Sequence, residues 1–403
     1  MTTEASIFAV GDVFIDRDDP STAFHSAKEF LRGGDVLFGN CEGAFSDIWE
    51  RAPSSGSPVV APAVNARPLA EAGFDVVSLA NNHSVDGGYG ALLNTCATLA
   101  ELGVSPVGAG ADIAAARRPV VVNRGGLRVA FVAYASVFPY GYEAKAAVPG
   151  LAPLRAHTRY TPWEPNEWQP GLVPRVTTET LAQDLTALRE DLRAARERAD
   201  VVVASFHWGD FTRPYVLTDH ERRCARVAVD AGADIVLGHH HHMLRGVEFY
   251  RGKPIFYGLG HYLFDLPRLR ERLAKDGYLS ATGPEDELAL SRRFGEYRIQ
   301  PKEGYPLLPF HEDSRLTGVA VVRVSANDGP VAVGFRPAVI GPDNEPVHAS
   351  PGSEQWKSVV TYLERCCAEE RLATRFVPRQ AGSGLPEDCV QILPEDRGEG
   401  GGA

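Results

Sequence analysis

The chain has 403 residues, of which 44% are hydrophobic and 23% are charged, so it has enough apolar material for a large buried core. Its formal net charge of −11 opposes attraction to nucleic acids and to anionic membrane surfaces, which we therefore exclude as expected partners. No apolar run approaches the roughly 18 residues of a membrane helix, the amino terminus lacks the basic start of a secretory signal, and the six cysteines show no CxxC spacing, so we expect a cytoplasmic protein.

From Ala5 to about Gly260, short β-branched runs alternate with Ala- and Leu-rich segments of helical period, of which Leu181–Arg198 is the clearest. This alternation is typical of an α/β protein with helices on the faces of a sheet. Six runs are expected as strands: Ser6–Val10, Val36–Phe38, Val76–Leu79, Val129–Ala133, Val201–Ser205 and Ile235–Leu237.

Polar residues follow five of the expected strands. Because functional groups collect beyond the carboxyl ends of strands in open α/β sheets, we expect these endings to share one pocket. Asn, Asp and Gly are also common turn formers after a strand, so a single ending has a structural explanation as well. The five endings are Gly11-Asp12, Gly39-Asn40-Cys41-Glu42, Asn81-Asn82-His83, His207-Trp208-Gly209-Asp210, and Gly238 followed by His239–His242.

Segments outside this alternation define the rest of the domain organisation. Phe138–Thr178 is rich in proline and aromatic residues, and we expect either a long lid-like loop or a family-specific insertion there. A strand pair, Thr317–Val324 and Val331–Phe335, and a helix near Glu354–Leu372 are expected to form a small C-terminal appendage. The predicted organisation is a core at 1–265 with the lid-like loop at 138–178, appended strands and helix completing the domain at 266–378, and a mostly disordered tail at 379–403.

Four consecutive histidines, His239–His242, directly follow an apolar strand. Neutral imidazole is the commonest transition-metal ligand, and side chains two or three positions apart in a turning segment can converge on one point. Asp12, Glu42 and Asn82 add hard oxygen donors. This mixed set suits one or two divalent ions such as Zn, Mn, Fe or Ca, although Asp12 or Asn82 alone is more often a turn or helix-cap residue.

The order and spacing of these motifs resemble those of the CapA family of poly-γ-glutamate capsule synthesis proteins (PGA_cap) throughout Ile7–Asp265. The resemblance implies a calcineurin-like metallophosphoesterase core, a layered sheet sandwich flanked by helices. It also implies a ligand set of Asp12, Glu42, Asn82, His207, His239 and His242, with His240 as an alternative to His239, and it makes His83 the proton-handling histidine beside Asn82. The motifs are Val10-Gly-Asp12, Phe38-Gly-Asn-Cys-Glu42-Gly, Val77-Ser-Leu-Ala-Asn-Asn82-His83, His207-Trp-Gly, Gly238-His-His-His-His242 and Gly252-Lys-Pro-Ile-Phe-Tyr-Gly-Leu-Gly260.

Two residues depart from the family pattern. His241 stands where the family usually has proline between the last histidines, and His261 stands where it commonly has asparagine after Leu-Gly. His261 brings an additional titratable group to the expected site, unless it merely hydrogen-bonds a neighbouring loop. Many family members look membrane-anchored and this chain shows no anchor, so we expect an intracellular substrate.

These features favour a metal-dependent enzyme with a peptide or peptide-like substrate. The preferred hypothesis is acid/base epimerisation at a peptide Cα, as in the soluble lasso-peptide epimerases that resemble CapA, with His83, His261 and Asp12 as catalytic groups and with Asp86 and Asp265 orienting the two histidines. The alternatives are hydrolysis of a phosphoester or amide bond and an accessory role in capsule or poly-γ-glutamate synthesis. No motif contains Arg or Lys before Arg245, which weakens the phosphatase hypothesis.

Overall fold

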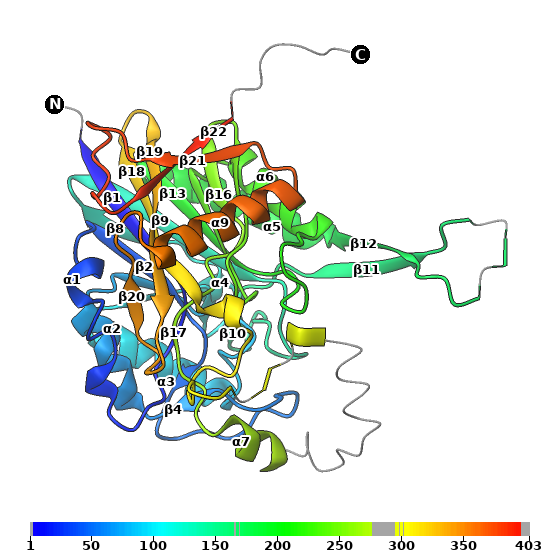
Figure 1. The fold of residues 1–403 in the computed structure, drawn as a ribbon. Coiled ribbons are helices and arrows are strands. Elements are labelled where there is room, and N and C mark those ends of the chain that lie inside the picture. Colours follow the sequence, from blue (N-terminus) through cyan, green and yellow to red (C-terminus); the bar gives the residue numbers. More distant parts are fainter. Residues whose placement is uncertain are drawn as a thin grey trace.

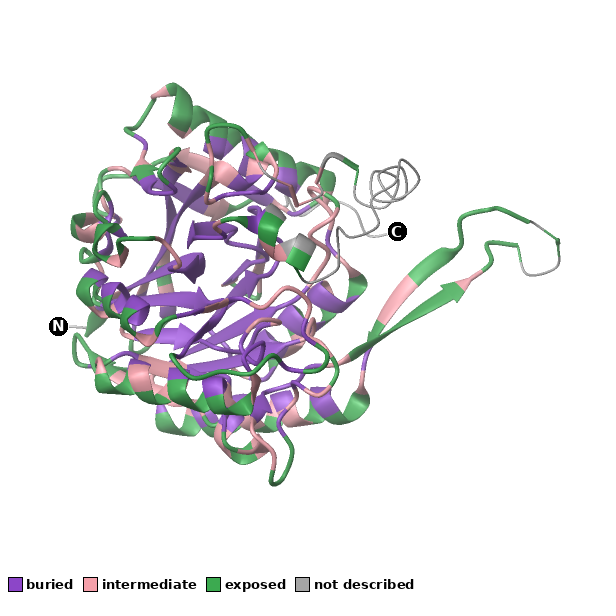
Figure 2. Cartoon of the chain, turned by 90° about the horizontal axis from the view of Figure 1, so that it is seen from below, coloured by how far each residue is buried: buried purple, intermediate pink, exposed green. Residues whose placement is uncertain are grey.

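The structure, a computed structural model, describes residues 3–164, 167–168, 170–275, 295–297, 299–300 and 302–395. Its framework is a pair of large β-sheets with helices on their outer sides (Figure 1). Figure 2 shows the sheets buried and the helices exposed on their solvent side. Among the described residues, no helix has the length and apolar character needed to cross a membrane.

The first sheet has ten strands and is built around β1 (Glu4–Phe14). On one side of β1 the strands β2 (Val36–Cys41), β5 (Val76–Ser78) and β6 (Ser105–Val107) follow in parallel order. The carboxyl end of β1 also pairs in parallel with β17 (His261–Phe264). The carboxyl ends of these central strands therefore point to one edge of the sheet.

The second sheet has six strands in the order β15-β16-β14-β13-β9-β8. Its four inner strands run parallel and are β9 (Leu127–Ala135), β13 (Val201–His207), β14 (Ile235–His239) and β16 (Lys253–Phe256). The antiparallel edge strands are β8 (Val120–Arg124) and β15 (Val247–Tyr250).

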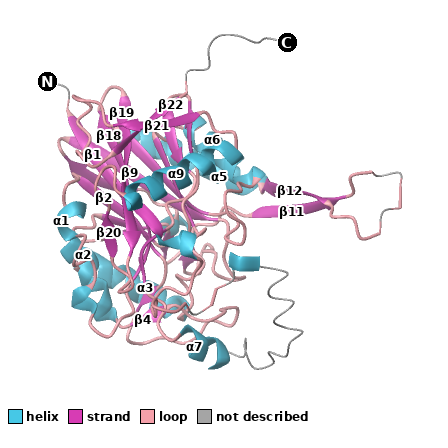
Figure 3. Cartoon of the chain, in the orientation of Figure 1, coloured by secondary structure: helices cyan, strands magenta, loops and turns pink. Residues whose placement is uncertain are grey.

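The two sheets pack face to face, as the stacking of Phe38 from β2 on Phe131 from β9 shows, with ring centroids 5.3 Å apart. The helices α1 (Lys28–Leu31), α2 (Arg67–Ala72) and α3 (Gly88–Glu101) bury residues such as Leu69 and Leu99 in a cluster with the other face of the first sheet. The helices α5 (Ala182–Arg198) and α6 (Asp219–Asp230) bury Leu188 and Cys224 in a cluster with the other face of the second sheet. The predicted α/β class and layered sheet sandwich are confirmed (Figure 3).

All six predicted strands are present, and four of them extend into the polar endings. β1 continues through Asp12, β2 ends at Cys41, β13 ends at His207 and β14 ends at His239. The backbones of several candidate ligands are thus fixed by strand pairing, which positions side chains more firmly than a free loop does.

The prediction of a C-terminal appendage needs correction. β18 (Leu316–Ser325) pairs directly with β1, and β19 (Gly329–Ile340) pairs with β18, so both extend the first sheet. Their inward-facing residues Val322 and Phe335 join the core between the sheets, which explains why the sheet takes them up. α9 (Glu354–Glu369) packs against the same core through Val359 and Leu363.

The prediction of a disordered tail at 379–403 is wrong for residues 379–395. β22 (Val390–Pro394) pairs with β21 (Thr374–Pro378) and with β19. Val390 and Ile392 alternate along β22 and are both buried, so this short strand contributes apolar surface that the overall composition of the tail concealed. The predicted disorder at 396–403 lies outside the described residues.

The segment Phe138–Thr178 is not the structureless loop that the sequence predicts. β11 (Ala156–Thr161) and β12 (Arg175–Thr180) form an antiparallel hairpin that projects away from the body, so these strands do not cover the edge of the sheets (Figure 1). The hairpin forms its own ladder and a cross-strand ion pair, Arg159–Glu179 at 3.2 Å. Its base contacts the body, where Thr178 and Thr180 of β12 bond His220 of α6.

The remaining elements are short and connect the main layers. They are η1 (Pro20–Thr22), β3 (Ala44–Phe45), β4 (Val60–Ala61), η2 (Ala63–Ala66), β7 (Ala109–Gly110), α4 (Ile113–Ala116), β10 (Gly150–Leu151), α7 (Leu269–Lys275), η3 (Gly295–Tyr297), η4 (Glu312–Arg315) and β20 (Pro346–His348).

Candidate metal centre

The predicted ligands meet where the carboxyl ends of the parallel strands in one sheet face those in the other sheet. Asp12 lies in β1, Glu42 one residue after β2, and Asn82 in the turn after β5. His207 and His239 are the last residues of β13 and β14 in the second sheet, and they are register partners. Each sheet thus supplies one side of the site.

Backbone geometry brings the connecting segments close together. A Cβ built on Gly11 would lie 1.9 Å from the carbonyl oxygen of Gly260, and one on Gly238 would lie 1.9 Å from that of Tyr257. Only glycine fits at these two crossings. His240 and His242 adopt left-handed backbone conformations, with φ of 92° and 57°. Such conformations cost about 1–3 kcal/mol per non-glycine residue and are found mainly at functional sites.

A first group of donors surrounds His207. Its Nε2 lies 2.7 Å from Oδ1 of Asn82 and 3.7 Å from Oε1 of Glu42. Nδ1 of His240 lies 3.1 Å from the same His207 nitrogen. The predicted ligands Glu42, Asn82 and His207 are therefore brought together, and His240 reaches them too.

A second group surrounds Asp12. Its Oδ2 lies 3.2 Å from Nδ1 of His242, and its Oδ1 lies 3.5 Å from Nδ1 of His239. His242 also connects the two groups, because its Nε2 lies 3.9 Å from Oε1 of Glu42. His239 and His240 both approach the site, so both stay candidates for the ligand position.

The donor atoms fit a divalent cation. Oε1 of Glu42 and both ring nitrogens of His239 are buried and have no hydrogen-bond partner among the described residues. Such groups are costly unless something else satisfies them. Three sets of donors lie within 4.8 Å of one another and share members: Asp12–Glu42–His207, Glu42–His240–His242 and Asp12–His242–His261. Mixed carboxylate and imidazole donors suit Zn, Mn or Fe, and the oxygen atoms also suit Ca.

The electrostatics of the two carboxylates also favour a cation. Burial and the neighbouring Asp12 hold the pKa of Glu42 well above its usual range. Burial opposes ionisation of Asp12 as well, but the neighbouring imidazoles of His239 and His242 outweigh it and hold the pKa of this carboxyl well below its usual range. Two buried carboxylates this close need positive charge between them, which a metal ion supplies.

His83 stands beside the cluster as part of a hydrogen-bonded chain. Its Nδ1 lies 2.7 Å from Oδ2 of Asp86, whose Oδ1 accepts a 2.6 Å hydrogen bond from the hydroxyl of Tyr142. The predicted pairing of His83 with Asp86 is confirmed. The side chain of His83 is 24% exposed and that of Asp86 is 2% exposed, so the imidazole faces solvent while its carboxylate partner is buried.

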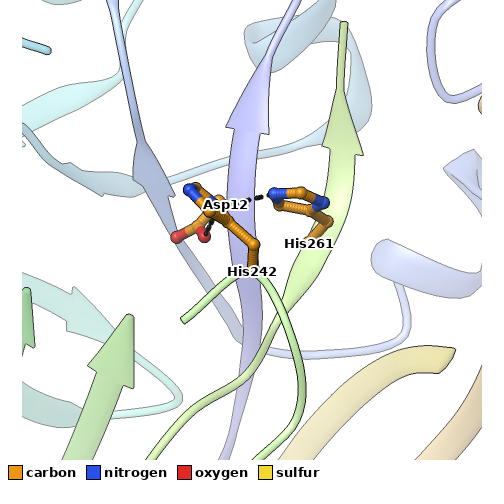
Figure 4. A group of neighbouring side chains, drawn as sticks. All are labelled: Asp12, His242 and His261. Atoms are coloured by element: carbon orange, nitrogen blue, oxygen red, sulfur yellow. Dashed lines mark hydrogen bonds and ion pairs between the residues drawn. The ribbon is translucent and has the colours of Figure 1, made fainter. Parts of the chain in front are cut away.

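His261 also reaches the cluster, but its predicted pairing with Asp265 is wrong. Asp265 is held by Arg17 at 2.8 and 2.9 Å and by the amide of Asn344 at 2.7 Å. The Nε2 of His261 instead lies 2.6 Å from Nδ1 of His242, and Figure 4 shows the two rings beside Asp12. The ring stacks on Phe264 and is fully buried, so His261 does not simply bond a neighbouring loop.

His241 points away from the metal donors. Its Nε2 lies 2.8 Å from Oε1 of Glu221, and both side chains are fully buried. Glu221 also forms the capping box at the start of α6 with Thr218. The histidine at the family's proline position is thus a structural partner of α6.

Replacing His241 by alanine is expected to destabilise the fold by about 1–3 kcal/mol, because Oε1 of the buried Glu221 loses its partner. Chemical denaturation measures this change, and metal content should stay at the wild-type level. Loss of metal in this variant would place His241 among the ligands instead.

Two asparagines of the site were not predicted. The amide nitrogen of Asn40 donates to Oδ1 of Asp12 at 2.9 Å and approaches Oε2 of Glu42 at 3.4 Å. The amide nitrogen of Asn81 donates to Oδ1 of Asn40 at 3.2 Å and to the carbonyl of Cys41 at 2.8 Å. Both residues orient ligands, as outer partners of metal sites commonly do. Their position next to predicted ligands was the available signal.

Comparisons with known proteins bear on the family to which this chain belongs. The family described as "Bacterial capsule synthesis protein PGA_cap" matches residues 6–266. The PGA biosynthesis protein CapA of Bacillus subtilis (strain 168) is 30% identical over 205 residues, which are 51% of this chain and 46% of that protein. The protein y4sH of Sinorhizobium fredii (strain NBRC 101917 / NGR234), described as uncharacterized, is 30% identical over 325 residues, 68% of each chain. The chain thus spans about half the length of the Bacillus relative.

Among solved structures, the calcineurin-like phosphoesterase YfkN of Bacillus subtilis is similar to 92% of this chain and 96% of its own, at 11% identity and a TM-score of 0.38. The family match covers well over half of the chain and extends across every residue of the metal cluster, from Asp12 to His261. The protein therefore belongs to the PGA_cap family of bacterial capsule synthesis proteins.

Proposed function

We propose that this protein is a metal-dependent acid/base enzyme that acts on a peptide-like substrate and epimerises one Cα. The observation that carries the proposal is the His83–Asp86 pair, which places a partly exposed imidazole beside a buried cluster of histidines and carboxylates. Removing a Cα proton requires a base at one face, a donor at the other, and stabilisation of the carbonyl oxygen.

In this proposal, proton transfer is assigned to two groups of this protein. His83 presents its free edge to solvent while Asp86 holds its Nδ1 side, which suits an imidazole that takes up and releases a proton. The second group belongs to the hydrogen-bonded chain of Asp12, His242 and His261. Because His261 is fully buried, it exchanges protons with the substrate through these hydrogen bonds and not by direct contact. A divalent ion held by Asp12, Glu42 and the neighbouring histidines would supply a Lewis acid for the substrate carbonyl.

The charges around the cluster favour a peptide over a phosphoester. In the described part of the chain, the ion pairs of Asp12 and Glu42 are all with histidines. Sites that transfer phosphoryl groups commonly add Arg or Lys clamps. The name of the Bacillus relative, a PGA biosynthesis protein, also supports a peptide-like substrate.

Hydrolysis is the second candidate, and one observation favours it. A hydrolase needs a single exposed acid/base group beside the metal, and His83 is the more exposed of the two histidines proposed for proton transfer. An accessory role in capsule or poly-γ-glutamate synthesis is compatible with either chemistry.

Incubation with peptides in deuterium oxide distinguishes these reactions. Suitable substrates are α-linked peptides and γ-linked oligoglutamates, with p-nitrophenyl phosphate as a phosphoester. Epimerisation introduces solvent deuterium at one Cα without changing the peptide's connectivity, which mass spectrometry and chiral amino-acid analysis detect. Release of peptide fragments or of p-nitrophenol, with no deuterium at Cα, would contradict epimerisation and support hydrolysis.

His261→Asn is expected to lower deuterium exchange by about 10²–10⁴-fold with nearly unchanged metal content, because asparagine cannot relay a proton to His242. The matched control is His220→Asn, which alters a buried histidine that bonds Ser136 and Thr180 outside the cluster. Exchange at the wild-type rate in His261→Asn would make His261 structural and remove it from the proposed mechanism.

A further inference from the structure

A cavity of about 950 Å³ is lined in part by Val85 and Tyr142, and none of its walls belongs to the metal cluster. It is lined by the segment Ile48–Ser54, by the start of α3 and by the turn Tyr140–Tyr142. Three large apolar side chains on this lining, Trp49, Tyr89 and Tyr140, are 48%, 40% and 95% exposed. Pockets of about 300–1,000 Å³ with mainly apolar walls are typical of small-molecule and side-chain binding sites.

The cavity wall is connected directly to the proposed acid/base group. Tyr142 lines the cavity, and its hydroxyl donates to Asp86, the carboxylate that holds His83. Val85, between His83 and Asp86 in the chain, also lines it. On the other side His83 directly follows the candidate ligand Asn82, whose Oδ1 lies 2.7 Å from Nε2 of His207. His83 is therefore connected to the cavity wall through Asp86 and adjoins a candidate metal ligand in the chain.

Hydrogen bonds fix the shape of the cavity. The hydroxyl of Tyr89 donates to the carbonyl of Gly141 at 2.8 Å, and the hydroxyl of Ser54 donates to the carbonyl of Tyr140 at 2.5 Å. Together with the bond from Tyr142 to Asp86, they tie the turn to three other parts of the chain. A pocket held in this way is largely formed before a ligand enters, which reduces the entropic cost of binding.

We propose that this cavity is the subsite for an aromatic side chain of the peptide-like substrate, next to the Cα on which the enzyme acts. The inference rests on the proposed function. Exposed aromatic rings are costly to leave in water, and Trp49, Tyr89 and Tyr140 offer faces and edges that suit another ring. The volume also leaves room for residues on either side of that ring. Specificity for an aromatic residue would thus come from the cavity and the chemistry from the groups around His83.

Binding of two matched peptides tests the subsite on the full chain loaded with metal. N-acetyl-Ala-Trp-Ala-amide is expected to bind at least about tenfold more tightly than N-acetyl-Ala-Ala-Ala-amide, because burying an apolar ring is worth more than the about 1.4 kcal/mol that a factor of ten represents. Trp49→Ala and Tyr140→Ala should each reduce binding of the Trp peptide to near that of the Ala peptide. Tyr140 is 95% exposed, so its replacement does not threaten folding.

The matched control is Tyr160→Ala, which removes a 67% exposed tyrosine from the projecting hairpin and should leave binding unchanged. Deuterium exchange at Cα is measured on the same samples. One outcome is that the wild type prefers the Trp peptide, the cavity variants lose this preference, and no deuterium exchange occurs. This outcome supports the subsite and contradicts the proposed function. The opposite outcome is that both peptides exchange deuterium at Cα and bind with the same Kd, and that Trp49→Ala and Tyr140→Ala change neither value. This outcome supports the chemistry and overturns the subsite.

Discussion

Replacement of His242 by alanine is expected to lower metal affinity by on the order of a hundredfold or more and to abolish activity. His242 contributes donors to two of the three ligand sets, through Asp12 on one side and Glu42 on the other. Changes to outer partners of metal sites alone cost about 10–100-fold, so loss of a shared inner donor should cost at least the upper part of that range. Metal analysis after dialysis against a weak chelator measures the effect.

The neighbouring variant His241→Ala is the matched control, since its ring is bonded to Glu221 and points away from the donors. Both variants remove an imidazole from the same four-residue stretch, so a difference in metal content reports ligation. His242→Ala should also unfold at lower temperature, because Asp12 and Glu42 then lie close together with less positive charge between them. Wild-type metal content and activity in His242→Ala would show that this residue is not a ligand.

Asp86→Asn is expected to lower turnover by about 10²–10⁴-fold while metal content stays unchanged. The carboxylate holds Nδ1 of His83 and supports the protonated ring, whereas an amide does not stabilise that charge. The size of the side chain is kept, and the amide oxygen still accepts a hydrogen bond from the backbone nitrogen of Val59 or from Tyr142. Turnover at saturating peptide, compared with the Michaelis constant, isolates this effect from substrate binding.

A double variant sharpens the test of the His83–Asp86 pair. His83→Gln should be as impaired as Asp86→Asn, and the two changes together should cost little more than either alone, because they remove one functional unit. Tyr142→Phe removes one hydrogen bond to Asp86 and leaves the pair itself, so it should cost about tenfold or less. Additive losses in the double variant would mean that Asp86 and His83 act separately.

The strands and the convergence of the candidate ligands are predictable from the sequence for a local reason. A buried parallel strand is a short apolar run, and the residue that follows it, such as Asp12 or His239, is fixed near the end of that run. Parallel strands align their carboxyl ends, so local pattern is enough to bring these ligands to one edge.

The partners of His261 and His241 were not predictable, because distant residues decide them. Asp265 is four positions from His261 in the chain. Its carboxylate is nevertheless bound by Arg17, 248 positions from Asp265, through two hydrogen bonds. Glu221 likewise reaches His241 from the start of α6. Sequence spacing alone contains no information about such tertiary competition.

The projecting hairpin and the last strand were missed for a different reason. β11 and β12 stabilise each other through their own ladder, so they need no apolar alternation toward a core. β22 is five residues long, and the charged and glycine-rich residues around it dominated the composition on which the tail prediction rested. Short strands that depend on a partner elsewhere in the chain leave a weak local pattern.

The pairing of β1 with β18 has a consequence for how the protein folds during synthesis. Ile7 pairs with Val322, so the strand that carries Asp12 lacks one neighbour until more than three quarters of the chain has left the ribosome. Closing so long a loop costs chain entropy that is offset only when the pairing itself forms, and such non-local pairings form slowly. Ribosome-bound chains stopped before β18 would expose an unpaired edge of β1, which makes nascent protein a target for chaperones and for aggregation until the sheet closes.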